Sequence, residues 1–271
     1  MSTQSTRKHV TVNTLREMKA SGDKIACLTA YDASCARVLD DNAIDVVLVG
    51  DSLGMVVHGD DSTLGVTMED MLYHTAAVRK GIKHALLMAD MPFLSYSSVE
   101  MALENAGALM KESGAEMVKL EGGSDQSDIV SALATQGIPV CAHLGLQPQR
   151  VHKIGGYRVQ GREADAAEFM IEEARLLEEA GADAVLLECM PAELAARITE
   201  TVKVPVIGIG AGGDTDGQIL VLYDILGISA GHIPKFSHNF MRDADDIAGA
   251  VKAFTDAVKT GAFPSEAHTF S

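Results

Sequence analysis

Residues 85–121, ALLMADMPFLSYSSVEMALENAGALMKESGAEMVKLE, contain a strand, a helix and a second strand in the order that builds a parallel sheet. Ala85–Met88 and Met117–Leu120 are short, continuous apolar runs, which are typical of strands buried on both faces. Ser98–Ser113 begins with a capping serine and an acidic first turn and ends before a glycine, which predicts a helix. A unit of this kind favours a parallel α/β fold.

The same alternation extends over the rest of the chain. Helices are predicted at Asp165–Ala180 and Pro191–Thr201, with an extra helix, Val12–Ala20, before the first strand and another, Asp245–Lys259, after the last. The other predicted strands are Ile25–Thr29, Val46–Val49, Val140–His143, Ala184–Leu187, Val206–Ile209 and Ile219–Leu222.

Eight strands in 271 residues fit a (β/α)8 TIM barrel, which typically needs about 250 residues. Only GAGGDTDGQ separates the last two strands, which is too short for a crossover helix, so an open doubly wound sheet is the alternative architecture. No linker or low-complexity segment divides the chain, which predicts a single domain over residues 1–271.

The composition is acidic, with 38 Asp and Glu against 22 Lys and Arg and a net charge of −16. Such a chain repels phosphate backbones and anionic lipids, so neither nucleic acid nor a membrane surface is an expected partner. The N-terminal residues contain no apolar signal segment, and no run of about 18 apolar residues follows, so we expect a cytoplasmic protein. The four cysteines lack the spacing of a metal site or a disulfide framework, and we expect buried thiols.

Ionisable residues close most of the central strands. Because a barrel gathers the C-terminal ends of its strands at one face, these side chains are expected to meet there. Each acid alone is compatible with a helix cap, but buried carboxylates are costly unless they are paired or bind a metal. Three converging carboxylates suggest a hard cation such as Mg²⁺. The strand-end residues are Asp51, Ser52, Asp90, Lys119, Glu121, His143 and Glu188.

Several of these side chains have more than one interpretation. Lys119 lies two residues from Glu121 and shares its face, so it is a candidate for binding an anionic substrate, for a Schiff base, or for a structural ion pair. His143 is a candidate metal ligand or hydrogen-bonding residue. The apolar neighbours of Glu188 favour a raised pKa and a general base, whereas an ion pair is the structural alternative. The glycines of Gly208–Gly213 predict a tight turn or a close backbone approach rather than phosphate binding.

Twelve segments follow one another from about residue 29 to the end of the chain: TAYD (29–32), VGDSLGM (49–55), GDDSTLGVT (59–67), YHTAAV (73–78), MADMPF (88–93), MVKLEGG (117–123), HLGLQPQ (143–149), GGYRVQGR (155–162), LLECMP (186–191), IGIGAG (207–212), TDGQILV (215–221) and GHIPKF (231–236). On these segments the chain resembles the ketopantoate hydroxymethyltransferase family. That family has a (β/α)8 barrel of the phosphoenolpyruvate/pyruvate-type superfamily. GDD at 59–61, where the family usually has Gly-His-Asp, and GD at 213–214 depart from its pattern, and the second departure lies at the rim of the substrate site.

The resemblance implies roles for the strand-end residues. The Mg²⁺ ligands are expected to be Asp51, Asp90 and Glu121, and the catalytic base Glu188. Asp51 and Asp90, together with Ser52, Lys119 and His143, are the expected substrate-binding residues.

The implied reaction transfers a hydroxymethyl group from the co-substrate 5,10-methylenetetrahydrofolate to 3-methyl-2-oxobutanoate. The product is 2-dehydropantoate, formed for pantothenate biosynthesis by aldol-type addition of a Mg-bound enolate. The resemblance also implies a homo-oligomer, commonly a decamer, for which Val12–Ala20 and Asp245–Lys259 are the candidate contacts.

Two other functions are compatible with the same strand ends. A magnesium-dependent lyase of the same superfamily would carry a loop cysteine within Lys-Arg-Cys-Gly-His, and that segment does not occur in the chain. A non-catalytic ligand-binding barrel would show no turnover and would retain its ligand after replacement of Glu188.

Overall fold

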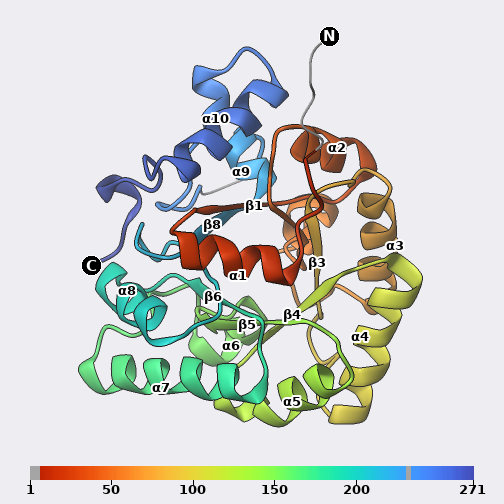
Figure 1. Ribbon diagram of the computed structural model, residues 1–271, viewed down its shortest axis with the longest axis vertical. Helices are drawn as coiled ribbons and strands as arrows, with labels where there is room; N and C mark the ends of the chain where they lie inside the picture. The colour runs from red at the N-terminus through yellow and green to blue at the C-terminus, as the bar shows by residue number, and fades with distance from the viewer. Residues whose placement is uncertain (1–6, 230–232) are drawn as a thin grey trace.

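The computed structural model describes residues 7–229 and 233–271; the start of the chain and the first two residues of the GHIPKF segment lie outside this range. Eight parallel strands form a closed barrel in chain order, in which β1 pairs with both β2 and β8 (Figure 1). This confirms the (β/α)8 prediction and excludes the open sheet. The strands are β1 (Ile25–Thr29), β2 (Val46–Val49), β3 (Leu86–Asp90), β4 (Met117–Glu121), β5 (Val140–Gly145), β6 (Ala184–Glu188), β7 (Val206–Ile209) and β8 (Gly217–Leu220).

Helices surround the barrel, and one helix, α1 (Val12–Ser21), lies across its end (Figure 1). The short segments η1 to η5 and α6 occupy loops between these elements. None of the helices within the described ranges is long and apolar enough to cross a membrane. The surrounding helices are α2 (Ala33–Asp41), α3 (Met68–Arg79), α4 (Val99–Ser113), α5 (Ser127–Thr135), α7 (Ala164–Ala180), α8 (Ala192–Thr201), α9 (Leu222–Leu226) and α10 (Ile247–Lys259); the short segments are η1 (Gly54–His58), η2 (Ser124–Gln126), η3 (Pro148–Arg150), α6 (Val151–Ile154), η4 (Phe240–Asp243) and η5 (Glu266–His268).

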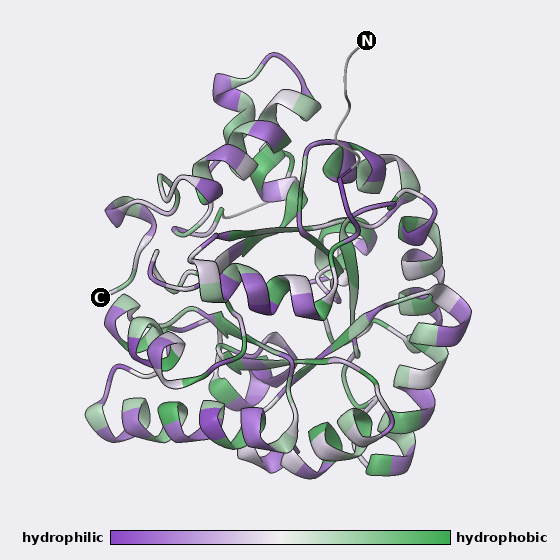
Figure 2. Ribbon diagram, in the orientation of Figure 1, coloured by the Kyte–Doolittle hydropathy of each residue, from purple (hydrophilic) through white to green (hydrophobic). Residues whose placement is uncertain are grey.

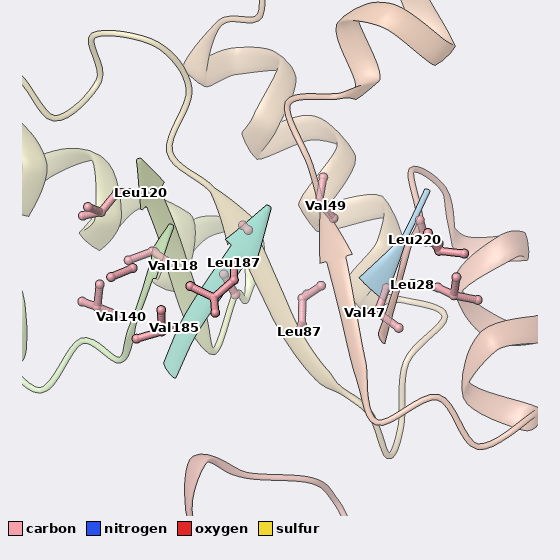
Figure 3. Packing of buried hydrophobic residues seen from close by; sticks show 14 of the residues in the cluster. Leu28, Val47, Val49, Leu87, Val118, Leu120, Val140, Val185, Leu187 and Leu220 are labelled. Atoms are coloured by element: carbon pink, nitrogen blue, oxygen red, sulfur yellow. The ribbon is translucent and has the colours of Figure 1, made fainter. Parts of the chain in front are cut away.

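The main apolar core lies between the strands and the surrounding helices. Alternate strand residues such as Val47, Leu87, Val118 and Leu187 point outward into it and are fully buried (Figure 3). The helices carry apolar residues toward this layer and polar residues away from it, so each helix shows both colours in Figure 2, whereas the strands are mostly apolar. The outward half of each strand therefore serves packing alone.

The inward-facing residues of the strands form a second apolar cluster, which fills the barrel toward the N-terminal ends of the strands. Leu15 of α1 is 2% exposed and packs into this cluster, so α1 closes the barrel at the N-terminal ends of the strands. Side chains two residues apart on a strand point to the same face. The inward positions beyond these apolar residues therefore lie at the C-terminal ends of the strands, opposite α1. The second cluster includes Ile25, Cys27, Val46, Leu48, Leu86, Met88, Met117, Cys141, Ala184, Leu186, Ile207 and Ile219.

Several predicted element boundaries differ from the structure by one or two residues, and three of the differences have a local cause. Strand β8 begins at Gly217 instead of Ile219, because the bare backbone of Gly217 fits between β1 and β7; a Cβ there would lie 2.5 Å from the carbonyl oxygen of Ile25. Pro191 caps α8 rather than starting it. Asp246 accepts a hydrogen bond from the backbone of Gly249 as the N-cap of α10, so that helix begins at Ile247.

The two helices expected to be additions to the barrel differ in position. Helix α10 contacts β1, α2 and α9, and so occupies the outer place between the last and first strands. Phe254 of α10 is fully buried in the main core. Both α1 and α10 therefore bury an apolar face against their own barrel.

Candidate active site

A single ammonium group lies among carboxylates at the C-terminal ends of the strands. Lys119 on β4 is 5% exposed, and its Nζ lies 3.0 Å from Oδ1 of Asp90 on β3. Burial alone would lower the pKa of Lys119, but Asp90, Glu121 and Asp51 together raise it above its usual value. The lysine is therefore a charged, hydrogen-bonding group and not a neutral amine ready to attack a carbonyl.

His143 links Lys119 to the end of the next strand but one. The Lys119 ammonium donates to His143 Nδ1 at 3.3 Å, and since an ammonium only donates, Nδ1 must carry no proton. Burial, and then Lys119, lower the pKa of His143 well below its usual value, so the neutral ring carries its proton on Nε2. Nε2 lies 3.3 Å from Oε2 of Glu188 but has no aligned hydrogen-bond partner.

Glu188 ends β6, and its side chain is 16% exposed, the most open of the strand-end acids that lie within 4 Å of Lys119 or His143. Burial raises the pKa of Glu188 to about 7; the nearby Lys119 acts to lower it. A carboxylate in this range can accept a proton near neutral pH and has direct access to the mouth of the barrel.

The backbone around Glu188 is tightly constrained. Leu146 N donates to the carbonyl oxygen of Glu188 at 2.8 Å. Gly145 has a φ of 91°, and a Cβ on it would lie 2.2 Å from that same oxygen. Cys189 follows with a φ of 49°, which a side chain rarely adopts. These contacts fix the position from which the Glu188 side chain points into the barrel.

Asp51 and Ser52 lie in the turn after β2. Asp51 N donates to Oδ2 of Asp90 at 3.0 Å, so the turn is joined to the end of β3. Burial, and then the neighbouring Asp90, raise the pKa of Asp51 to about 7. Ser52 Oγ lies 2.9 Å from Tyr31 Oη, at the edge of the cluster. A Cβ on Gly50 would lie 2.7 Å from Ser52 Oγ, so a glycine is needed there.

Two buried residues of the site were not found by the sequence analysis. Gln149 Nε2 donates to Asp51 Oδ2 at 2.8 Å, and Gln149 N donates to Glu121 Oε2 at 3.0 Å. Tyr96 Oη donates to Gln149 Oε1 at 2.5 Å. Both residues lie in loops, where no periodic pattern marks them. Gln149 does stand in the HLGLQPQ segment, which was quoted only for its family resemblance.

The carboxylates leave oxygen atoms without partners. Glu121 Oε1 is buried and has no hydrogen-bond partner, and Asp90 Oδ1 is buried with only the Lys119 ammonium beside it. Burial, and then Asp51, raise the pKa of Glu121 above its usual value. However, within residues 7–229 and 233–271 no three His, Cys, Asp or Glu side chains are arranged to hold a metal ion. The site therefore offers separate hard oxygen atoms rather than a closed three-carboxylate cage.

A cationic segment, residues 150–162, lies at the mouth of the barrel. Residues 129–162 contain no Asp or Glu, although the chain has 38 acidic residues. Tyr157 Oη donates to Met55 Sδ at 3.7 Å, and Gln160 N donates to the carbonyl oxygen of Cys189 at 2.9 Å. Burial, followed by Glu188, raises the pKa of Tyr157, which agrees with its position beside the acids. The cations of this segment are Arg150, Lys153, Arg158 and Arg162.

The structure thus brings the predicted strand-end residues to one end of the barrel. Asp90, Lys119, Glu121, His143 and Glu188 are linked by contacts of 3.0 to 3.7 Å. Asp51 joins them through Asp90 and Gln149, and Ser52 lies at the edge. The four cysteines are free thiols. The turn prediction for residues 208–213 agrees with the positive φ of Gly210 and Gly212.

Comparisons with known proteins give one family. The sequence profile described as ketopantoate hydroxymethyltransferase matches residues 9–266. The chain is 58% identical to 3-methyl-2-oxobutanoate hydroxymethyltransferase of Alkalilimnicola ehrlichii over 98% of this chain and 96% of that protein. It is 59% identical to the protein of that name from Marinobacter nauticus, over 96% of this chain and 98% of the other.

Solved structures of the same fold are more distant in sequence. One is 2,3-dimethylmalate lyase, described as a member of the PEP mutase/isocitrate lyase superfamily, with a TM-score of 0.57, 18% identity and coverage of 80% of this chain and 81% of that one. Another is a phosphonomutase-like protein of Burkholderia cenocepacia, with a TM-score of 0.64, 15% identity and coverage of 80% and 94%. At these identities the likeness shows the barrel fold alone.

Proposed function

The chain belongs to the ketopantoate hydroxymethyltransferase family and is a hydroxymethyltransferase; we propose that it transfers a hydroxymethyl group from 5,10-methylenetetrahydrofolate to 3-methyl-2-oxobutanoate. The product is 2-dehydropantoate, formed by an aldol-type addition. One observation supports this most strongly: a carboxylate with a pKa of about 7, Glu188, stands beside a buried lysine and a set of hard oxygen ligands. Those are the groups needed to bind a 2-oxo acid and to remove its C3 proton.

Mg²⁺ fits the oxygen atoms of the site, because Glu121 Oε1 is buried without a hydrogen-bond partner and Asp90 Oδ1 has only the ion pair with Lys119. Mg²⁺ usually keeps several waters and binds proteins through one or two carboxylates, so a three-carboxylate cage is not required. Asp51, Asp90 and Glu121 would hold it. When bound, Mg²⁺ would polarise the keto and carboxylate oxygens of the 2-oxo acid and make its C3 proton more acidic.

Lys119 is proposed to bind the charged end of the 2-oxo acid. Its ammonium group has three N–H donors, of which one faces Asp90 and one faces His143. The third is free to donate to a substrate oxygen. The surrounding acids keep the lysine protonated, so it supplies the local positive charge that an anionic substrate needs in a chain of net charge −16.

Glu188 is proposed to remove the C3 proton. Its burial makes the carboxylate a stronger base than one in water, and the apolar strand behind it excludes solvent. His143 Nε2 lies 3.3 Å from the same carboxylate without an aligned hydrogen bond, and the lowered pKa of His143 keeps it from competing for the proton. The enolate carbon would then form a bond to the methylene carbon of the donor as the bonds from that carbon to the two folate nitrogens break. Water supplies the hydroxyl oxygen, and tetrahydrofolate leaves with one proton from water and the proton that Glu188 removed.

The donor is proposed to approach over the cationic segment of residues 150–162. Folates carry glutamate carboxylates at one end, and the chain has few places where an anion is not repelled. Lys153 and Arg158 are exposed in this segment, which contains no acidic residue and lies beside Glu188. Such a surface would attract an anionic co-substrate to the mouth of the barrel.

The assay that tests the proposal combines purified protein, Mg²⁺, 3-methyl-2-oxobutanoate and 5,10-methylenetetrahydrofolate, and measures 2-dehydropantoate by mass spectrometry. We expect product only when all components are present, and none after treatment with EDTA. Omission of the folate should leave exchange of the C3 proton with deuterium intact, because that step needs only the acid, the metal and Glu188. Product formation without the folate would contradict the proposed donor, and binding without any turnover would indicate a non-catalytic barrel.

The chain is also proposed to form a homo-oligomer, as the family resemblance implies a decamer. Large apolar side chains such as Tyr73 on α3 and Phe169 on α7 are 73% and 60% exposed. Burial of such side chains in subunit contacts would remove apolar surface from water. Light scattering at micromolar concentration tests this, and the mass of a single chain would contradict it.

A further inference from the structure

Gln149 is 5% exposed and lies just beyond β5, where its side chain contacts the ends of β2 and β3 and its backbone N–H contacts the end of β4. We propose that Gln149 is a positioning residue, which sets the carboxylates of Asp51 and Glu121 for the cation and the 2-oxo acid, and that Tyr96 locks it in place. The inference rests on the proposed function. Gln149 is not among the strand-end residues to which a role has been assigned.

The direction of every hydrogen bond in this network is determined. The backbone N–H of Glu121 donates to Tyr96 Oη at 3.2 Å, so the tyrosine hydroxyl is left to donate to Gln149 Oε1. The amide nitrogen of Gln149 faces two acceptors, Asp51 Oδ2 at 2.8 Å and the carbonyl oxygen of Met91 at 3.0 Å. An amide turned the other way would place its oxygen against both acceptors, so only one orientation is possible.

Gln149 holds two carboxylates that repel each other. Asp51 follows β2 and Glu121 ends β4, and both carboxylates are buried at the same end of the barrel. Gln149 Nε2 occupies one oxygen of Asp51, and Gln149 N occupies Oε2 of Glu121. The other oxygen of Glu121, Oε1, remains without a hydrogen-bond partner. One oxygen of each carboxylate is thus fixed while the second is left for a ligand.

A neutral donor is the suitable residue for this position. A lysine or arginine would neutralise the carboxylates and compete with a cation for them. A hydrocarbon side chain would leave Asp51 Oδ2 and the carbonyl oxygen of Met91 buried without a donor, which is costly. An amide satisfies both acceptors and leaves the negative charge of the site intact, and the Tyr96 hydroxyl prevents it from rotating.

The test measures Mg²⁺ binding to the free protein by isothermal titration calorimetry, with no substrate present. Gln149→Met keeps the length of the side chain and removes its hydrogen bonds to Asp51 and to the carbonyl oxygen of Met91. The backbone hydrogen bond from residue 149 to Glu121 remains. Loss of a residue that orients metal ligands typically weakens metal affinity about 10–100-fold. We expect that range for Gln149→Met and a smaller loss for Tyr96→Phe. The double variant should be no worse than Gln149→Met alone, because the two residues act as one unit.

Gln147→Met is the matched control. Gln147 is also buried, two residues away, but its amide donates at 3.4 Å to the backbone carbonyl oxygen of His143 and not to a carboxylate. It should bind Mg²⁺ with nearly the wild-type Kd. At saturating Mg²⁺, Gln149→Met should raise KM for 3-methyl-2-oxobutanoate while kcat changes by a few-fold at most.

A wild-type Mg²⁺ affinity in Gln149→Met, or an equal loss in Gln147→Met, would overturn the inference while leaving the proposed function intact. Wild-type protein that binds no Mg²⁺ would instead contradict the proposed function, and the inference with it. If Gln149→Met does not fold, Tyr96→Phe decides the question, since it keeps the ring and removes only the hydroxyl. An unchanged Kd for Mg²⁺ in a folded Tyr96→Phe variant would then contradict the proposal that Tyr96 holds Gln149 in place.

Discussion

Replacing Glu188 by Gln should remove activity and at the same time stabilise the protein at alkaline pH. The side chain is 16% exposed and its burial raises the carboxyl pKa to about 7 from an ordinary value of 4.5. Gln has the size and shape of the protonated acid but cannot ionise. The variant therefore retains the packing of Glu188 and avoids the cost of placing its negative charge in the barrel.

The magnitude follows from linkage between protonation and folding. A tenfold change in proton affinity is worth about 1.4 kcal/mol, so the raised pKa of Glu188 makes the ionised folded state less stable by about 3 kcal/mol. Below pH 4.5 both folded and unfolded chains are protonated and there is no cost. As pH rises from about 4.5 to about 7, the unfolded chain ionises at this position while the folded chain stays protonated, and the folded protein loses stability over that range. The Gln variant should thus gain about 3 kcal/mol at pH 8.5 but only about 1 kcal/mol at pH 5.

Thermal unfolding in EDTA at the two pH values measures the effect. Since 1 kcal/mol shifts Tm by about 2–4 °C in chains of 150–250 residues, Glu188→Gln should melt about 6–12 °C above wild type at pH 8.5 and about 2–4 °C above it at pH 5. The matched control is Glu104→Gln, which makes the same change at an exposed position of α4. Its Tm should follow that of the wild type at both pH values.

The kinetic consequence of the same variant is independent. A general base contributes typically about 10²–10⁴-fold in rate, and the loss should lie in kcat more than in KM. Mg²⁺ and the 2-oxo acid should still bind. A Tm difference that does not grow with pH would refute the buried-charge reasoning. Wild-type deuterium exchange at C3 in the Gln variant would show that Glu188 is not the base, and His143 would become the next candidate.

Four further outcomes are expected. Chelation by EDTA should abolish turnover and added Mg²⁺ restore it, and Asp51→Asn should not be rescued at any practical Mg²⁺ concentration; full activity of a metal-stripped sample would contradict this. The kcat/KM of the wild type should rise with pH and level off above about 7, because burial of Glu188 in the free protein raises its pKa to about 7 and only its ionised form accepts the proton. Gly145→Ala places a Cβ 2.2 Å from the Glu188 carbonyl oxygen, so it should lose kcat and stability, whereas Gly137→Ala, also at positive φ but with no atom within 4 Å, should cost only about 1–2 kcal/mol. Arg158→Ala should raise KM for the folate donor and leave KM for the 2-oxo acid unchanged.

The fold and most of the site could be predicted from the sequence because both follow from local patterns. An apolar strand that ends in an acid appears in the sequence as a run followed by a charge, and closure of the barrel brings such ends together. Lys119 and Glu121 were assigned to one face from their spacing alone, and both lie inward in the buried cluster. The wrong prediction of where β8 begins arises from contacts that are not local in the sequence. Gly217 resembles a turn residue, but the strand needs it because of contacts with β1 and β7 that no local pattern records.

Gln149 and Tyr96 could not be predicted for a related reason. They are 53 residues apart and lie in loops, and their hydrogen bond exists only after the barrel has closed. Polar residues in loops usually face water, so their types carry no signal of burial. A segment shared with a protein family can indicate that such a residue belongs to a site. Only the folded structure shows which carboxylates the residue contacts.

The charge balance of the site explains why so many of its groups are shifted from their ordinary pKa values. Four carboxylates, those of Asp51, Asp90, Glu121 and Glu188, face one ammonium, and burial makes this excess of negative charge expensive. The free protein can relieve it only by taking up protons, which is why the carboxyl pKa values of Asp51, Glu121 and Glu188 are raised. A divalent cation relieves it without protons and leaves Glu188, outside the proposed ligand set, as the carboxylate able to accept one. The same imbalance that weakens the free protein thus favours the cation and reserves a base for the substrate.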